Sequence, residues 1–323
     1  MKDLAQQCQP FYESAGIARM PSRTQIEISG ADRLTFLHNY CTADIKRLQP
    51  GRGTEAFITS VKGKVLGHGF VYCGEESLVF ETVEGQAEKL LAHLDRYTLA
   101  DDVELKDVSD GWVFHFVGGP KAASILQDVT GDTVPENQFA FTTSFVGDVE
   151  CAYARGGAIS PAGFTMCCGE DDREEFAARL ADAGFVAAPP ETLKVLRVEG
   201  GMPFFAVDIT EDNLPQEANR NDQAISFTKG CYLGQETVAR LDALGHVNKL
   251  LVGVKFNGEA VPQAGLELTV GEKAVGKVTS AVYSPALKSP LAMAYVRTDD
   301  SEKGTMLSSS VGDAEVVSLP LSN

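Results

Sequence analysis

Apolar residues recur at two different spacings along the first 190 residues of the chain. Intervals of three and four residues predict amphipathic helices, whereas alternation, or a short apolar run between glycine and proline signals, predicts a strand. The first helix is expected from about Asp32 to Leu48, where Pro50 ends it. Further helices are expected around residues 87–94, 122–129 and 173–184, and strands around 23–28, 55–61, 65–72, 78–83, 103–108, 112–117, 139–145, 149–154 and 164–168.

The order of these elements partly repeats along the chain. Each half begins with a strand and a helix and continues with further strands and a second helix, which is typical of the split βαβ arrangement of ferredoxin-like units. From about residue 249 the pattern changes to six short strands without helical spacing, which predicts a small β-barrel. The predicted fold class is therefore α+β. We expect one ferredoxin-like unit over residues 1–110, a second over 111–190, a connecting segment over 191–248 and the barrel over 249–323.

Composition and charge narrow the functional classes. The 323 residues are 44% hydrophobic and 23% charged, so the chain can bury a sizeable core, and disorder as its dominant state is excluded. Forty-five acidic residues against 28 basic ones give a net charge of −17, which repels nucleic-acid backbones and anionic lipid surfaces. No apolar run reaches about 18 residues, and residues 1–8 contain no apolar signal region. We expect a cytoplasmic protein that binds neither membranes nor nucleic acid directly.

The seven cysteines form no metal-binding pattern. Their number is odd and no C-x-x-C pair occurs, so the sequence predicts neither a disulfide framework nor a metal or cluster site. Six of them are interpreted as small buried hydrophobic residues. The seventh, Cys231, lies in the densest cluster of unusual residues in the chain.

That cluster, KGCYLGQETVAR at residues 229–240, predicts a tight turn that opens a helix. Cys231 is expected near the amino end of this helix, where the helix dipole and Lys229 would lower the pKa of the thiol. Gln235 and Glu236 offer hydrogen-bonding groups for the edge of a bound ring, and Arg240 offers a guanidinium for a carboxylate. The structural alternative, equally open at this point, is that glycine and cysteine allow close packing at a domain junction.

The run Lys-Gly-Cys-Tyr-x-Gly-Gln-Glu at 229–236, with Val-Ala-Arg after it, resembles the signature of the YgfZ family of tetrahydrofolate-binding proteins. These are relatives of GcvT, the aminomethyltransferase of glycine cleavage. Further segments between about residues 20 and 320 resemble the pattern of the superfamily. They are residues 30–32, 42–44, 196–201, 214–217, 276–280 and 284–285.

The resemblance implies a GcvT-like three-lobed ring of two ferredoxin-like units and a β-barrel, with a reduced folate in a central channel. It implies tetrahydrofolate as cofactor and a role in assembly or repair of iron–sulfur clusters in client enzymes, some of which modify tRNA. It also implies that Cys231 is the functional thiol and that Lys229 and Arg240 contact the folate carboxylates. The signature residues expected to bind folate are Lys229, Tyr232, Gln235, Glu236 and Arg240.

Two departures from the transferase pattern concern its acidic residues. The transferase carries paired aspartates after a glycine-rich strand start, one of them catalytic, and Gly67 and His68 stand at these positions. Glycine carries no charge to stabilise an iminium-like carbon, and a protonated histidine has the wrong sign. Pro161 and Thr165 replace two acids of a later stretch, one of which would hold the pterin ring. We expect Glu199 to hold the pterin instead and His68 to line the channel.

Three functional hypotheses follow. The first is a YgfZ-type folate-binding factor that serves iron–sulfur enzymes and their assembly proteins. The second is an enzyme that transfers or removes a one-carbon unit of folate, such as an aminomethyl group, with acid–base groups other than the missing aspartates. The third is a binding module without chemistry, whose ring fold docks partners.

Overall fold

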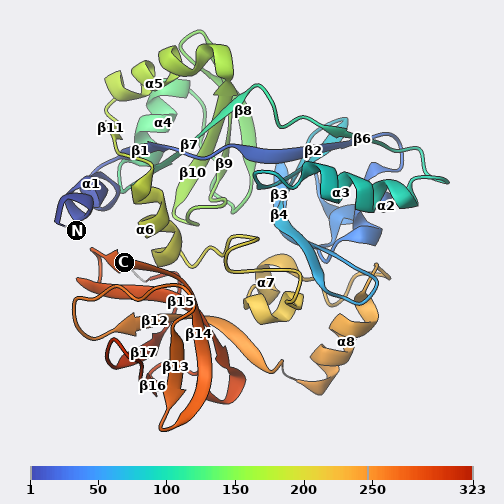
Figure 1. Cartoon of the computed structure of the whole chain (residues 1–323). Helices are drawn as coiled ribbons and strands as arrows, with labels where there is room; N and C mark the ends of the chain where they lie inside the picture. Colours follow the sequence, from blue (N-terminus) through green and yellow to red (C-terminus); the bar gives the residue numbers. More distant parts are fainter. Residues whose placement is uncertain (1, 246, 322–323) are drawn as a thin grey trace.

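The computed structural model describes residues 2–245 and 247–321, which form three lobes (Figure 1). The first lobe contains a five-stranded antiparallel sheet in the order β3-β4-β5-β2-β6. Apolar side chains of two helices pack on one face of this sheet. The elements are β2 (Arg23–Ser29), α2 (Arg33–Tyr40), β3 (Arg52–Thr59), β4 (Val65–Cys73), β5 (Ser77–Val83), α3 (Ala87–Leu94) and β6 (Glu104–Asp107).

The second lobe is built on a sheet in the order β11-β1-β7-β10-β9-β8, with α4 and α5 on one face. Strand β1 pairs antiparallel with β7 and parallel with β11, so residues 16–19 belong to this second sheet. The unit expected over residues 1–110 thus lends one strand to the other lobe, and its boundaries stay a prediction. The elements are β1 (Gly16–Arg19), β7 (Trp112–Gly118), α4 (Ala122–Thr130), β8 (Phe141–Val146), β9 (Val149–Arg155), β10 (Gly163–Gly169), α5 (Arg173–Asp182) and β11 (Val186–Ala187).

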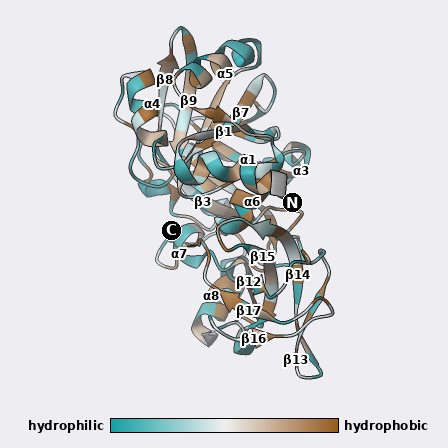
Figure 2. Ribbon diagram, turned by 90° about the vertical axis from the view of Figure 1, so that its left-hand side faces the viewer, coloured by the Kyte–Doolittle hydropathy of each residue, from teal (hydrophilic) through white to brown (hydrophobic). Residues whose placement is uncertain are grey.

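The third lobe is the expected barrel, which lies at one end of the molecule in the turned view of Figure 2. Its strands follow the order β13-β14-β15-β12-β17-β16, and a bridge between Thr269 and Ser308 brings the two ends of the sheet together. The α+β fold class with a carboxy-terminal barrel is therefore confirmed. The strands are β12 (Lys249–Phe256), β13 (Glu267–Val270), β14 (Lys273–Ser284), β15 (Ser289–Arg297), β16 (Met306–Leu307) and β17 (Ala314–Val317).

Four helices connect the lobes or cover their junctions: α1 (Lys2–Glu13), α6 (Glu191–Glu199), α7 (Asn221–Ala224) and α8 (Gln235–Leu244). Helix α6 packs against α1 and against β14 and β15 of the barrel. Short 3-10 helices occur at Ile45–Arg47, Asp95–Tyr97, Glu170–Asp172, Pro215–Ala218 and Thr298–Asp300. No helix in the described part of the chain is long and apolar enough to cross a membrane.

A buried carboxylate fixes α6 to the barrel. Oδ2 of Asp208 accepts hydrogen bonds from the Arg197 guanidinium at 2.6 Å and from the backbone N–H of Phe204 at 3.0 Å. Oδ1 accepts from the hydroxyls of Thr279 and Ser280, both at 2.6 Å. The Asp208 side chain is fully buried, so this junction depends on four donors around one desolvated charge.

Helix α1 was not expected from the sequence, and helix α2, expected from about Asp32 to Leu48, is shorter than the sequence predicts. It ends at Tyr40, Cys41 is extended, and only a 3-10 turn follows where the helix was expected to continue to Leu48. The ammonium group of Lys229, which is far away in the sequence, binds the carbonyl of His38 in the last turn and those of Cys41 and Ala43 just beyond it. A tertiary contact therefore ends the helix, and local spacing gave no signal for it.

Candidate functional site

The sheets of the first and second lobes face each other, and the faces that meet are those without helices. Side chains on these sides come from alternate positions of each strand, such as Phe70 and Tyr72 on β4. The rings of Phe70 and Phe139 lie 5.2 Å apart, and those of Tyr72 and Phe141 lie 5.5 Å apart in an edge-on arrangement. Between the sheets is a cavity of about 190 Å³, which we call the inter-sheet cavity.

The walls of the inter-sheet cavity are mainly apolar and include several aromatic side chains. Phe114, Phe141 and Trp112 line it. Trp112 is the single tryptophan of the chain and is 43% exposed. The thiol of Cys167 also lines it, and burial together with the nearby Glu81 charge raises its pKa to about 12. The thiol is therefore uncharged at neutral pH.

Two polar side chains, those of Glu81 and Tyr72, line this otherwise apolar cavity and offer complementary hydrogen-bonding groups. The buried carboxylate of Glu81 accepts from Nε of Arg23 at 3.1 Å, whereas its second oxygen has only a long contact with Gln25 at 3.4 Å. The hydroxyl of Tyr72 is buried and has no hydrogen-bond partner. Burial and the Glu81 charge raise the pKa of Tyr72 well above its usual range, so the hydroxyl is available as a donor. An unpaired buried hydroxyl is costly, and a ligand that accepts from it would remove that cost.

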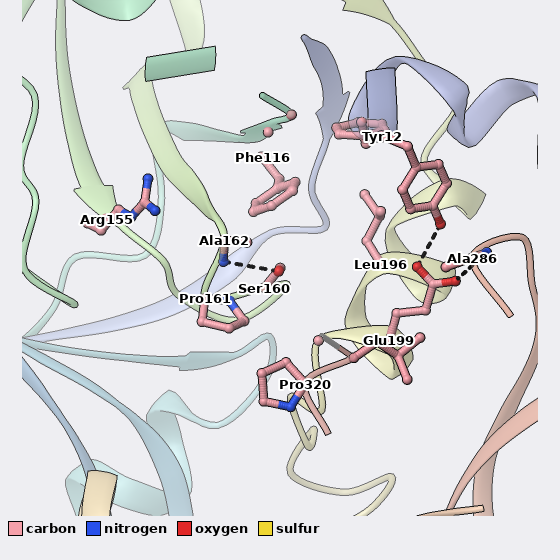
Figure 3. A pocket seen from close by; sticks show the side chains of 15 residues that line it. Tyr12, Phe116, Arg155, Ser160, Pro161, Ala162, Leu196, Glu199, Ala286 and Pro320 are labelled. Atoms are coloured by element: carbon pink, nitrogen blue, oxygen red, sulfur yellow. Dashed lines mark hydrogen bonds between the residues drawn. The ribbon is translucent and has the colours of Figure 1, made fainter. Parts of the chain in front are cut away.

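A second cavity, of about 300 Å³, lies beside α6 and contains Glu199 (Figure 3). Oε2 of Glu199 accepts from the Tyr12 hydroxyl at 2.6 Å, and Oε1 accepts from the Ser284 hydroxyl at 2.5 Å and from the backbone N–H of Ala286 at 3.4 Å. The carboxylate thus joins α1, α6 and the barrel. Both oxygens are used within the protein, and the expected contact of Glu199 with pterin stays a prediction.

Arg155 lies on the opposite side of this second cavity from Glu199 (Figure 3). Its Nε is buried without a hydrogen-bond partner, and its guanidinium carbon lies 4.9 Å from the centre of the Phe164 ring. Pro161, at one of the replaced acid positions, lines the same cavity, whereas Thr165, at the other, lines the inter-sheet cavity. The segment that differs from the transferase pattern therefore borders both cavities.

His68 is buried on β4 and forms part of a charged network. Its Nε2 lies 2.7 Å from Oε1 of Glu55, and Arg220 donates to both oxygens of the same carboxylate at 2.9 and 2.5 Å. Burial alone would raise the pKa of Glu55, but Arg220 and His68 lower it to about 2. The imidazole also stacks on Phe57 at 4.8 Å. His68 lines neither cavity, so its expected place in a folate channel stays a prediction.

Lys229 anchors the signature segment to the end of α2. Its buried ammonium donates to the carbonyls of His38, Cys41 and Ala43 at 2.5–2.8 Å and lies 4.7 Å from the centre of the buried Tyr232 ring. These bonds use all three ammonium protons. In this arrangement Lys229 and Tyr232 hold the loop, and the folate contacts expected of them stay predictions.

The rest of the signature lies on the surface of the first lobe. Gly234 has a φ of +85°, and a Cβ there would lie 2.5 Å from the carbonyl oxygen of Ser60, so only glycine fits. Helix α8 begins at Gln235, which places the exposed Cys231 before the helix and outside its first turn. Gly234 and Lys229 thus make packing contacts, whereas the exposed Cys231 takes no part in them. The role of the segment as a binding site stays a prediction.

The remaining signature candidates do not meet in a cavity. Gln235 is half-buried, and Glu236 and Arg240 are exposed. None of them lines the inter-sheet cavity or the cavity beside α6. Their folate contacts stay predictions.

Sequence analysis missed Tyr72, Glu81 and Arg155. Alternation along β5 places Val79 and Glu81 on one face, but a polar residue on an alternating strand usually indicates a solvent-exposed face. The signal that could have identified Glu81 is the position of Arg23 and Gln25 on the neighbouring strand of the same sheet. Charged and amide groups on adjacent strands are what a polar site between two sheets requires.

Comparisons with known proteins cover nearly the whole chain. The model of the GCVT N-terminal domain matches residues 1–229, and that of the glycine cleavage T-protein C-terminal barrel domain matches residues 249–322. The aminomethyltransferase of Rubrobacter xylanophilus is 28% identical over 283 residues, which cover 87% of this chain and 76% of the relative. That of Bacillus subtilis is 27% identical, with coverage of 91% and 83%.

Two further comparisons extend this result. A chloroplastic putative transferase of Arabidopsis thaliana is 26% identical, over 79% of this chain and 59% of its own length. The crystal structure of the glycine cleavage system aminomethyltransferase T from Bartonella henselae superposes with a TM-score of 0.86 at 21% identity, covering 98% of this chain and 89% of that one. It shows the same fold. Because the N-terminal family model matches well over half of the residues, the chain belongs to the GcvT family.

Proposed function

We propose that this protein binds a reduced folate by its pterin ring in the inter-sheet cavity. The observation that carries the proposal is the unpartnered hydroxyl of Tyr72, buried beside the Glu81 carboxylate between aromatic walls. The pyrimidine edge of a pterin presents N–H donors next to a carbonyl acceptor, which matches one carboxylate and one hydroxyl donor. Arg23 compensates the charge of Glu81, so the cavity suits a neutral ring.

The size of the cavity limits what enters it. A cavity of about 150 Å³ accommodates benzene, so one of about 190 Å³ takes a small fused ring and excludes the rest of a folate. The aminobenzoyl-glutamate part would then lie outside the cavity. Reduced folate supplies a pair of nitrogens that carry a one-carbon unit. The protein would supply the orientation of the ring, through Glu81 and Tyr72, and the exclusion of water by Phe114 and Phe141.

The activity we propose is transfer of a one-carbon unit, in the manner of an aminomethyltransferase. The names of the most similar relatives support this activity better than they support any other. The aspartates of the transferase pattern are absent, and the titratable group at that place is His68, oriented by Glu55.

Tyr72→Phe is expected to weaken tetrahydrofolate binding about threefold to tenfold, the usual worth of one hydrogen bond. The free energy of unfolding is expected to stay equal or rise slightly, because the substitution removes an unpaired buried hydroxyl. Binding is measured through quenching of Trp112, which stands among the lining residues of the cavity.

Tyr295→Phe is the matched control, since Tyr295 also has a buried, unpartnered hydroxyl but lies on β15 of the barrel. It is expected to bind folate as the wild type does. Equal affinity of the wild type and Tyr72→Phe would remove Tyr72 from the site. Absence of saturable quenching by tetrahydrofolate would refute the folate proposal itself.

A second candidate function is favoured by the exposed thiol. Among the seven cysteines, six are buried or half-buried and Cys231 alone is exposed, within the segment that resembles the YgfZ signature. In this alternative, the protein is a YgfZ-type factor that binds folate and supports iron–sulfur cluster assembly or repair in partner enzymes. A thiol reacts only where a reagent can reach it, and the fold leaves Cys231 accessible to solvent.

Native protein is expected to show a single fast equivalent in titration with a thiol-specific disulfide reagent, and Cys231→Ser is expected to lose it. Cys167→Ser should keep that fast phase, because Cys167 is buried with a raised pKa. The two candidate functions are then separated by assay of Cys231→Ser. Unchanged one-carbon transfer favours the transferase, whereas loss of cluster-enzyme activity in cells that depend on this protein favours the factor.

A further inference from the structure

A third cavity, of about 430 Å³, lies on the outer side of the second lobe, between β1, β7 and α5. It is on the opposite face of the sheet from the inter-sheet cavity. Along β7, Trp112 and Phe114 line the inter-sheet cavity, whereas the alternate residues Val113 and His115 line this one. Neither the GcvT-like features nor the proposed folate site involves this face.

The polar groups of this outer cavity are a histidine, two arginines and a glutamate. His115 is only 5% exposed, and its Nδ1 is buried without a hydrogen-bond partner. Burial and the charge of Arg19 lower the pKa of His115 to about 4, so the ring is neutral at pH 7. Arg19 is the direct neighbour of His115 across the β1–β7 ladder, is exposed, and forms none of the ion pairs found among the described residues.

The second arginine is already neutralised. Arg173, at the start of α5, contacts Glu170 at 2.5 Å and Glu174 at 3.6 Å. Glu174 also lines the cavity. One unpaired guanidinium therefore faces the ligand space next to an acidic side chain, an arrangement that suits a single negative charge and repels a dianion such as a phosphate monoester.

The remaining walls are small and apolar. They are formed by Ile17, Val113, Ala177, Ala181, Ala187 and Ala188. We propose that the outer cavity binds a small aliphatic carboxylate, with the carboxylate on Arg19 and on the Nδ1–H of His115, and the alkyl chain along the alanine side chains of α5 and β11. The bound carboxylate gives the buried imidazole nitrogen the partner that it lacks.

Hexanoate is the probe, titrated into the wild-type protein by calorimetry. We expect saturable binding that strengthens about threefold to fourfold for each CH₂ along acetate, butyrate and hexanoate, which is the worth of burying one such group. Arg19→Gln is expected to weaken hexanoate at least about tenfold, the usual scale for a hydrogen-bonded charge. Because Arg19 is exposed, this variant is expected to fold normally.

Lys121→Gln is the charge-matched control, an exposed cation of the same lobe outside the cavity. It should bind hexanoate as the wild type does, and so should Tyr72→Phe, which separates this site from the folate site. No saturable heat with hexanoate would overturn the proposal, as would equal affinity in Arg19→Gln or equal affinity for acetate and hexanoate.

Discussion

Glu55→Gln is expected to lower the free energy of unfolding by about 3–5 kcal/mol at pH 7, because it leaves the largely buried Arg220 guanidinium without its counter-charge. Glu55 is fully buried, and Arg220 is bound to both of its carboxylate oxygens while His68 contacts one of them. Urea denaturation at pH 7 measures the loss. Glu150→Gln, an exposed strand glutamate of the second lobe, is the control and should stay within about 0.5 kcal/mol of the wild type.

The same carboxylate predicts an acid limb of stability. The pKa of Glu55 falls from an ordinary 4.5 to about 2 on folding. Its contribution is therefore complete above the unfolded-state pKa and is lost as the pH falls from about 4.5 toward 2. The stability difference between the wild type and Glu55→Gln should shrink over this range. A difference that is constant with pH, or a loss below about 1 kcal/mol at pH 7, would contradict a stabilising ion pair.

Asp208→Ala is expected to lower the free energy of unfolding by a similar amount, about 3–5 kcal/mol. Arg197 loses its counter-charge, and three further donors lose their acceptor. The effect should extend beyond overall stability. Asp208 joins α6 to the hydroxyls of Thr279 and Ser280 on β14, so its loss loosens the barrel from the rest of the molecule. Hydrogen exchange should show faster exchange at β14 and α6 before global unfolding.

Asp313→Ala is the matched control for this prediction. Asp313 is an exposed barrel carboxylate that accepts one side-chain hydrogen bond, from Ser308 at 3.0 Å. Its removal should change stability by about 0.5 kcal/mol or less. If Asp208→Ala and Asp313→Ala were equally stable, the buried network would not hold the junction.

Most of the fold could be predicted from local signals. Strand alternation, helical spacing and the change of pattern near residue 249 predict the two α/β units and the barrel that the structure contains. The errors arise where distant residues decide the local conformation. Helix α2 ends at Tyr40, where Lys229 binds carbonyls in its last turn and just beyond it, and β1 joins the second sheet because its partners are β7 and β11. Neither contact leaves a trace in the spacing of neighbouring residues.

Less of the candidate site could be predicted. Motif matching identified Glu199, His68 and the signature segment, but the structure distributes them over three separate environments. The inter-sheet cavity is formed by strands from both lobes, and Glu81 becomes a buried acid only when the second sheet covers it. Such a site is a property of how two sheets pack, and single-strand periodicity indicates only which face each residue occupies.

The position of β1 has a consequence for how the chain acquires its structure during synthesis. Residues 16–19 are synthesised well before their partner strands, which are β7, beginning at Trp112, and β11, beginning at Val186. The intervening residues include the entire first sheet, which can form in the meantime. Strand β1 therefore stays unpaired until β7 has been synthesised, and its second edge stays open until β11 follows. During this interval the nascent chain presents an open strand edge that chaperones or neighbouring nascent chains can contact.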